Sequence, residues 1–164
     1  LRITLFPYTT LFRSGLLYVA LPLALLIYMK PAEIVFVLLL VVATDTGGYF
    51  AGCRLGGPKV WPSISPKKTW AGSFGGLALS LALALGYGTA FGEASWASFL
   101  LAGLLINLAA QFGDFFESAL KRMLGIKDSG TLLPGHGGVL DRIDGLLLAV
   151  PAYAGLRAVL PLFS

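Results

Sequence analysis

The sequence predicts an all-α, polytopic integral membrane protein with about five transmembrane helices and a polar cavity on its cytoplasmic side. Apolar residues make up 57% of the 164 positions and charged residues only 12%, about half the ~25% of an ordinary globular chain. The mean hydropathy is +0.83, and the apolar residues are grouped in runs that approach bilayer length. Too little polar surface remains to cover a water-soluble globule. This argues against a soluble enzyme, a disordered chain and a nucleic-acid-binding protein.

Five apolar runs are candidates for bilayer crossings, each of which needs about 20 mostly apolar residues. In chain order they are Gly15–Met29, Ile34–Gly52, Trp70–Phe91, Ser95–Gly113 and Ile143–Phe163. Five such runs in one small chain leave no soluble shell to bury them, so we do not interpret them as core helices of a soluble protein.

The distribution of Lys and Arg predicts the orientation of these crossings. Residues 53–69 carry four basic side chains, residues 114–142 carry another four, and the link around Glu93 carries none. By the positive-inside rule both basic segments lie in the cytoplasm, and the two crossings between them agree with that. The net charge of +4 therefore indicates cytoplasmic loops rather than a DNA-binding surface.

Charge is concentrated in one part of the chain. Five of the eight acidic residues fall within 31 positions: Asp114, Glu117, Asp128, Asp141 and Asp144. The fourth run also continues into a polar stripe whose members are three or four residues apart and so share one helix face. This stripe comprises Asn107, Gln111, Asp114, Ser118 and Lys121. A polar stripe at membrane depth must face a cavity or partners, although for Asn107 and Gln111 helix–helix adhesion is an equal alternative.

Asp141 and Asp144 begin the last run and are three residues apart, so both carboxylates lie on one side of the predicted helix start. Stabilisation by the helix dipole is one explanation. Two nearby carboxylates repel each other unless a cation joins them. Together with Asp114 they supply enough hard oxygen ligands for Mg²⁺, which binds a few carboxylates, waters and substrate phosphates.

Two loops have the composition of phosphate-binding segments. One contains Lys127-Asp128-Ser129-Gly130 followed by Gly135-His136-Gly137-Gly138, and the other contains Ser65-Pro66-Lys67-Lys68-Thr69. Glycine-rich backbone exposes N–H groups to phosphate oxygens, and paired lysines suit phosphates or anionic headgroups. A plain turn and a plain positive-inside anchor are the respective alternatives. Asp45 is a further functional candidate at the inner end of the second run, unless it pairs with Arg54 or Lys67.

These motifs, taken together, resemble the phosphatidate cytidylyltransferase (CDP-diacylglycerol synthase) family. The resemblance is carried by Ser118-x-x-Lys121-Arg122, Lys127-Asp128-Ser129-Gly130, Leu133-Pro134-Gly135-His136-Gly137-Gly138 and Asp141-Arg142-Ile143-Asp144. Gly113-Asp114, Glu117, Thr44-Asp45-Thr46-Gly47 and the segment from Ser65 to Thr69 also fit. On this basis residues 15–164 form the transmembrane catalytic domain, the C-terminal portion of the family fold. Residues 1–14 form an atypical N-terminal segment that does not resemble the family.

The resemblance implies that CTP and phosphatidate react to give CDP-diacylglycerol and pyrophosphate. It implies four catalytic residues, which are Asp114, Lys121, Asp141 and Asp144. It implies Mg²⁺ held by Asp114 and Asp141, with Asp144 and Glu117 as auxiliary ligands and a second metal ion or a monovalent cation left open. The implied substrate-binding residues are Ser65, Lys67, Lys68, Thr69, Ser118, Arg122, Lys127, Asp128, His136 and Arg142. His136 is expected to donate a hydrogen bond to phosphate, because the reaction needs no covalent intermediate.

The expected partners are CTP, phosphatidate and the lipid bilayer, without nucleic acid, and a homodimer is left open. The expected location is the inner membrane of the cell, as a multi-pass protein whose active site faces the cytoplasm. Three alternatives remain: a CTP-dependent lipid kinase or related lipid nucleotidyltransferase, a transporter with intramembrane polar residues along an ion path, and an inactive fragment.

Overall fold

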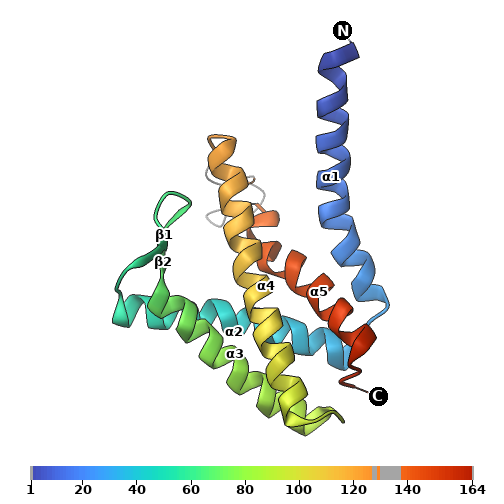
Figure 1. Ribbon diagram of the computed structural model, residues 1–164, viewed down its shortest axis with the longest axis vertical. Helices are drawn as coiled ribbons and strands as arrows, with labels where there is room; N and C mark the ends of the chain where they lie inside the picture. The colour runs from blue at the N-terminus through green and yellow to red at the C-terminus, as the bar shows by residue number, and fades with distance from the viewer. Residues whose placement is uncertain (1, 127–128, 130–137, 164) are drawn as a thin grey trace.

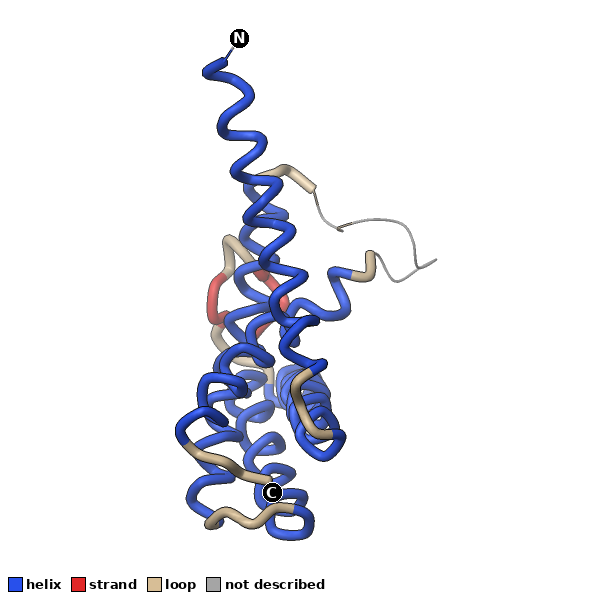
Figure 2. Tube along the Cα trace, turned by 90° about the vertical axis from the view of Figure 1, so that its right-hand side faces the viewer, coloured by secondary structure: helices blue, strands red, loops and turns tan. Residues whose placement is uncertain are grey.

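The computed structural model describes residues 2–126, 129 and 138–163, with side chains from residue 13 onward. Its elements are α1 (Arg2–Ile27), α2 (Pro31–Leu55), β1 (Lys59–Trp61), β2 (Ser65–Thr69), α3 (Trp70–Phe91), α4 (Trp96–Met123) and α5 (Leu140–Val159). Helices α2 to α5 pack together, whereas the N-terminal end of α1 extends beyond the other helices (Figures 1 and 2). The predicted helical architecture is confirmed, with one short hairpin added to it.

Three of the expected crossings correspond to suitable helices. Among the described residues, α2, α3 and α4 are long and apolar enough to span a membrane by length and composition. The apolar part of α1, Arg13–Ile27, is shorter, and α5 carries four charged residues, so the first and fifth crossings stay predictions. Large apolar side chains such as Val42, Phe74 and Phe112 are exposed on the outer faces of α2, α3 and α4, as expected of surfaces that face lipid.

The closest helix pair is α2 with α3, and glycine makes this approach possible. A methyl group on Gly76 would lie 2.5 Å from the backbone oxygen of Thr44, and one on Gly47 would lie 2.6 Å from that of Gly75. Small residues let membrane helices gain van der Waals contact along their backbones. The glycine-rich composition of the third expected crossing therefore has a packing role.

Glycine also sets the position of α5 on α4. A methyl group on Gly113 would lie 2.5 Å from the backbone oxygen of Asp144. This close approach brings the start of α5 beside the residue that follows Gly113, which is Asp114. Two carboxylates from distant parts of the sequence thereby become neighbours.

A buried polar cluster joins the opposite ends of α2 and α5. Glu33, 1% exposed, accepts a hydrogen bond from the Tyr153 hydroxyl at 3.1 Å and lies 3.0 Å from Nε of Arg157. The backbone N–H of Lys30 also donates to Glu33 at 2.8 Å, which caps α2. Arg157 in turn donates to the backbone oxygen of Tyr28 at 2.7 Å. These bonds fix the turn between α1 and α2 against α5.

The hairpin β1–β2 lies between α2 and α3, within a segment that the sequence analysis treats as a basic loop. Its strands are antiparallel, with Lys59 opposite Thr69. Nε of Arg122, near the end of α4, donates to the backbone oxygen of Ile64 at 3.3 Å. Oγ1 of Thr69 accepts the N–H of Gly72 at 3.1 Å and caps α3. The hairpin is therefore attached to two helices.

The α2–α3 packing gives a first prediction. Replacing Gly76 by Ala should lower the free energy of unfolding by about 1–3 kcal/mol, because the added methyl group meets backbone rather than a mobile side chain. Thermal unfolding in detergent micelles measures this change. The matched control is Gly86→Ala on the same helix, where nothing lies within 4 Å of an added methyl group. An equal effect of both substitutions would contradict the packing role of Gly76.

Candidate active site

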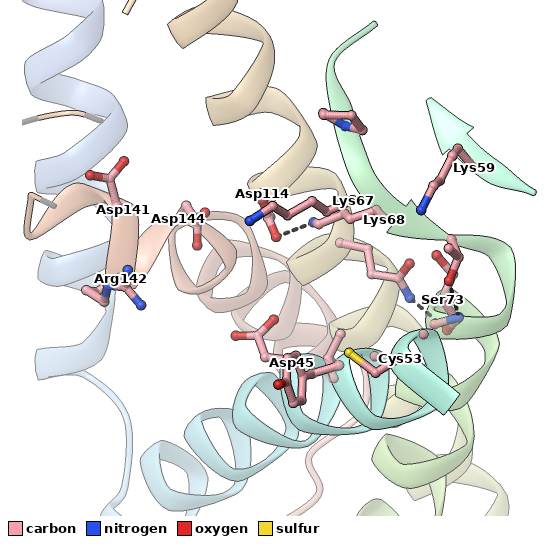
Figure 3. A pocket seen from close by; sticks show the side chains of 18 of the residues that line it. Asp45, Cys53, Lys59, Lys67, Lys68, Ser73, Asp114, Asp141, Arg142 and Asp144 are labelled. Atoms are coloured by element: carbon pink, nitrogen blue, oxygen red, sulfur yellow. Dashed lines mark hydrogen bonds and ion pairs between the residues drawn. The ribbon is translucent and has the colours of Figure 1, made fainter. Parts of the chain in front are cut away.

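An open cavity of about 810 Å³ lies where the hairpin, α2, α3, α4 and α5 meet. Figure 3 shows its charged side chains, with Lys59, Lys67 and Lys68 on the hairpin side and Asp45 on the side of α2. The described lining residues that can carry charge are Asp45, Lys59, Lys67, Lys68, Asp114, Lys121, Asp141, Arg142 and Asp144. A charged cavity of this kind is unusual among apolar helices and marks a functional site.

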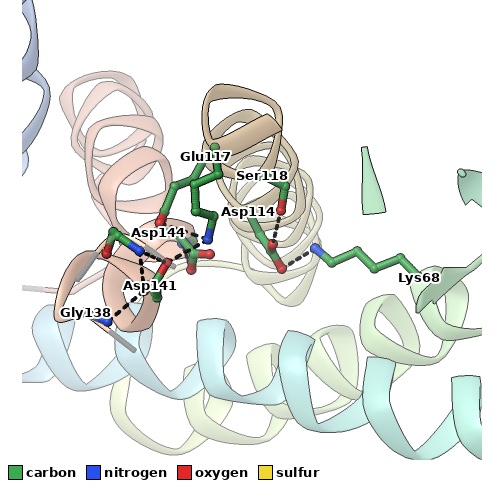
Figure 4. A network of polar contacts seen from close by, with 10 residues as sticks. Lys68, Asp114, Glu117, Ser118, Gly138, Asp141 and Asp144 are labelled. Carbon is green, nitrogen blue, oxygen red and sulfur yellow. Dashed lines mark hydrogen bonds and ion pairs between the residues drawn. The ribbon is translucent and has the colours of Figure 1, made fainter. Parts of the chain in front are cut away.

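Asp114 connects α4 to the hairpin. Its Oδ2 forms an ion pair with Nζ of Lys68 (Figure 4), and its Oδ1 accepts a hydrogen bond from the Ser118 hydroxyl at 3.4 Å. The Lys68 ammonium also lies 4.5 Å from the centroid of the Phe115 ring, within the range of a cation–π contact. Two kinds of contact with α4 thus hold the hairpin lysine beside the cavity.

Three carboxylates from three helices converge on this region. Asp144 of α5 lies close enough to Asp114 of α4 and Asp45 of α2 for their negative charges to repel it. Figure 3 shows Asp114, Asp144 and Asp45 around the same space. Like charges that approach one another in this way are stabilised by cations or protons, and Lys68 already supplies one positive charge at Asp114.

Asp141 is turned toward a different set of partners at the edge of the cavity. Nζ of Lys121 lies 2.7 Å from its Oδ1, and the N–H groups of Gly138 and Ser129 donate to its Oδ2 at 2.7 and 2.9 Å. Burial raises the pKa of this carboxyl, but the hydrogen bonds from Lys121, Gly138 and Ser129 outweigh burial and hold the pKa well below its usual range. Asp141 is therefore ionised, and it ties the start of α5 to α4.

Glu117 completes this cluster (Figure 4). Its Oε1 lies 3.2 Å from Nζ of Lys121, and its side chain is only 3% exposed. Its Oε2 has no hydrogen-bond partner among the residues that the structure describes. Lys121 therefore lies between two carboxylates, and a buried carboxylate oxygen is left unsatisfied beside them, which is costly unless a proton or a cation binds there.

Asn107 and Gln111 form a hydrogen-bonded chain that crosses the bundle. Nε2 of Gln111 donates to Oδ1 of Asn107 at 2.8 Å and to the backbone oxygen of Ser73 at 3.3 Å. Nδ2 of Asn107 donates to Oγ1 of Thr44 at 2.8 Å. Helices α2, α3 and α4 are thus joined by polar bonds, as the adhesion alternative predicts. Gln111 and Thr44 also line the cavity, so the two interpretations of the stripe are compatible.

The structure brings most of the predicted site residues to the cavity. The predicted residues that line it are Lys67, Lys68, Thr69, Asp114, Lys121, Asp141, Arg142 and Asp144. Ser65, Ser118 and Arg122 are not among the lining residues, and the last two instead bond to Asp114 and to the hairpin. Lys127, Asp128 and His136 lie outside the described residues.

Lys59 and Tyr49 line the cavity but were not predicted as site residues. The basic character of Lys59 was visible in the sequence, and its position follows only from the hairpin register. Tyr49 lies in the second apolar run, where nothing in the pattern separates a cavity-facing aromatic residue from one that faces lipid.

The donor set is suited to a hard divalent cation. Among the described residues, no group of three or more His, Cys, Asp or Glu side chains could hold a metal ion by itself. Mg²⁺, however, is usually bound by one or two carboxylates together with waters and substrate phosphates. Asp114, Asp141 and Asp144 line the cavity, whereas Glu117 is buried and is not among the lining residues. The roles of Asp114 and Asp141 as ligands stay predictions.

Comparison with known proteins gives consistent matches over most of the chain. A family model described as "Cytidylyltransferase family" matches residues 4–160. The chain is 46% identical over 147 residues to the phosphatidate cytidylyltransferase of Brucella suis biovar 1 (strain 1330), covering 87% of this chain and 53% of that protein. It is 46% identical over 122 residues to the phosphatidate cytidylyltransferase of Staphylococcus aureus (strain COL), covering 72% of this chain and 46% of that protein. The chain spans about half the length of the curated relatives it matches.

The position of Lys121 between two carboxylates gives a second prediction. Lys121→Met should lower the free energy of unfolding by about 3 kcal/mol, because Glu117 and Asp141 would remain as buried neighbouring carboxylates without their shared cation. Thermal unfolding in detergent micelles is again the measurement. The control Lys67→Met, at an exposed lysine of the hairpin, should change stability by less than about 0.5 kcal/mol. Equal stability of the two variants would show that Lys121 does not hold α4 to α5.

Proposed function

The chain belongs to the cytidylyltransferase family, and on this premise we propose that it transfers CMP from CTP to phosphatidate. The observation that carries the proposal is the cavity itself, where lysine, arginine and aspartate side chains from five elements meet at the ends of apolar helices. A water-soluble nucleotide and a lipid phosphate can meet at such a place. The names of the relatives in Brucella suis and Staphylococcus aureus state this same activity.

The proposed reaction is a displacement at the α-phosphorus of CTP. An oxygen of the phosphatidate phosphate forms a bond to that phosphorus, and the bond from the α-phosphorus to the bridging oxygen of the β-phosphate breaks. CDP-diacylglycerol and pyrophosphate are the products. The attacking phosphate is already an anion, so the reaction requires positioning and charge neutralisation more than it requires a strong base.

The lysines of the hairpin and the cations of α4 and α5 supply that neutralisation. Lys59, Lys67 and Lys68 line one side of the cavity, and Lys121 and Arg142 line another, so phosphates can be bound from two directions. Arg122 is a positioning residue in this proposal. It donates to the backbone oxygen of Ile64 and so orients the hairpin lysines, and Lys127, Asp128 and His136 are retained as substrate contacts from the sequence alone.

Asp114 and Asp141 are the proposed Mg²⁺ ligands, with Asp144 and Glu117 as auxiliary acids. A bound divalent ion would neutralise charge on the phosphates and on the departing pyrophosphate. The protein's own part is to hold these carboxylates in place. The Ser118 hydroxyl donates to Asp114, and the backbone N–H groups of Ser129 and Gly138 donate to Asp141. A second metal ion or a monovalent cation stays open.

We further propose a multi-pass location in the inner membrane with the cavity toward the cytoplasm. The basic segments around the hairpin and between α4 and α5 support this orientation. CTP would then enter from water, and phosphatidate would enter sideways from the inner leaflet between helices. A homodimer is compatible with this arrangement and stays a prediction.

The third prediction tests the function directly. Purified protein in detergent micelles, given phosphatidate, Mg²⁺ and CTP labelled on the α-phosphate, should produce labelled lipid and an equal amount of pyrophosphate. Release of CDP with transfer of the γ-phosphate would instead identify a CTP-dependent lipid kinase. CTP-independent ion flux in sealed vesicles, without lipid labelling, would identify a transporter.

The fourth prediction concerns the proposed metal ligands. Asp114→Asn and Asp141→Asn should each lower kcat by about 100-fold or more, because each removes a charge on which the position of the phosphates depends. They should also raise the Mg²⁺ concentration that gives half-maximal activity. Steady-state assays over a Mg²⁺ titration measure both effects.

The matched control for these variants is Glu93→Gln, at an exposed acidic residue between α3 and α4. It removes the same charge outside the cavity and should leave kcat and the Mg²⁺ dependence unchanged. Wild-type Mg²⁺ dependence in Asp141→Asn would exclude Asp141 as a ligand, and Asp144, which also lines the cavity, would take its place.

A further inference from the structure

The hydrogen-bonded chain through Gln111, Asn107 and Thr44 has a fixed direction. It ends at two backbone oxygens, those of Ser73 and Leu40, and a carbonyl oxygen can only accept a hydrogen bond. The Gln111 atom near Ser73 must therefore be Nε2. The same atom lies 2.8 Å from Asn107, so the Asn107 atom must be the acceptor Oδ1. Nδ2 of Asn107 then donates to Thr44, whose hydroxyl donates to Leu40 at 2.9 Å.

This direction decides what Gln111 can offer to the cavity. Both N–H bonds of its amide are used, one on Asn107 and one on Ser73. Because Asn107 is fully buried, water does not compete for this bond, and reversing the amide would place oxygen against oxygen at Ser73. Gln111 lines the cavity, and Oε1 is the atom of its amide that these two bonds do not use, so the amide can offer a ligand an uncharged acceptor held in one orientation.

An oriented acceptor selects for a ligand that carries a hydrogen-bond donor. Phosphate oxygens and the ester carbonyls of phosphatidate are acceptors and gain nothing from Oε1. A nucleotide carries donors on its base and on its ribose. Asp45, next to Thr44 on α2, adds a second acceptor among the lining residues, whereas Lys59, Lys67 and Lys68 present donors on the hairpin side (Figure 3). The phosphates would then contact the cationic side chains, and an amino group would lie against the uncharged acceptor of Gln111.

We propose that Gln111 is a specificity-determining residue whose Oε1 accepts a hydrogen bond from the exocyclic amine of cytosine, with Asn107 as its positioning residue. The inference rests on the proposed use of CTP. Uracil carries a carbonyl oxygen where cytosine carries the amine, so a fixed acceptor attracts the first base and repels the second. Discrimination against a ligand that lacks the required donor is strong when the acceptor is already oriented and cannot turn.

The test compares CTP, UTP and 2′-deoxyCTP as nucleotide substrates in the labelled-lipid assay. Wild type should prefer CTP to UTP. Gln111→Met keeps the length of the side chain but removes the acceptor. It should reduce the ratio of kcat/KM for CTP to that for UTP by at least about tenfold, mainly through a higher KM for CTP, and should leave the preference for CTP over 2′-deoxyCTP unchanged.

A second variant tests the positioning role. Asn107→Leu removes the shorter of the two bonds that orient the Gln111 amide and leaves only the 3.3 Å bond to Ser73, so the amide can turn more easily and offer N–H to uracil. The CTP to UTP ratio should fall in this variant through better use of UTP. The control Tyr87→Phe removes a hydroxyl that bonds to the backbone of Ala32 on the other side of the bundle and should leave the ratio unchanged. If Gln111→Met fails to fold, Asn107→Leu alone decides.

The outcomes separate this inference from the proposed function. No use of CTP by wild type would defeat the function, and the inference with it. Use of CTP with an unaltered CTP to UTP ratio in both variants would overturn the inference alone. A loss of discrimination confined to 2′-deoxyCTP would also overturn it, because it would show that Oε1 contacts the ribose and not the base.

Discussion

The structure depends on one electrostatic constraint, which is that a charge carried by an apolar helix must meet an opposite charge or water. Lys68 meets Asp114, and Lys121 meets both Glu117 and Asp141. The Lys68–Asp114 and Lys121–Asp141 pairs join segments that are distant in sequence, so these two pairs form only when the hairpin, α4 and α5 are packed together. The cavity is therefore a consequence of how the fold pairs its charges, and the same contacts that stabilise the fold line the site.

Close backbone packing makes these pairs geometrically accessible. Without a side chain at Gly113, α5 can approach α4 until Asp144 lies beside Asp114. At the far end of the bundle the buried Glu33, bonded to Tyr153 and Arg157, holds α2 to α5. The helices are thus tied together on both sides of the apolar core. Because the helices that carry the carboxylates are fixed at both ends of the bundle, the site needs little rearrangement when a charged ligand binds. Such preorganised charges are what electrostatic stabilisation of a transition state requires.

Most of the fold could be predicted from the sequence because the apolar runs and their helical period are local properties. The polar stripe of α4 could also be predicted, since a spacing of three and four residues places side chains on one face in any helix. The spacing of residues along one helix does not predict which other segment of the chain packs against that face. Asp141 and Asp144 were expected on one side of a helix, and both line the cavity. Asp141 contacts Lys121 whereas Asp144 lies toward Asp114, because these two partners are about two helical turns apart on α4.

The hairpin was not predicted for a related reason. Its strands are three and five residues long, and its pairing depends on contacts made elsewhere. Arg122 was expected to bind substrate, and in the structure it donates to the backbone of Ile64. Once the hairpin is in place, Lys59 reaches the cavity, a position that no spacing in a basic loop could reveal. Tertiary contacts, rather than local propensity, decide both outcomes.

The charge on the cavity wall bears on what the site can bind. The described lining residues carry five cationic side chains and four carboxylates, so the wall is nearly balanced. A nucleoside triphosphate and a lipid phosphate together would bring several further negative charges, which five partly neutralised cations could not offset. The carboxylates would oppose such ligands unless they bind a divalent ion. A carboxylate that binds such an ion attracts its lysine less strongly, so Lys68 and Lys121 would become available to phosphate at the moment when phosphate enters.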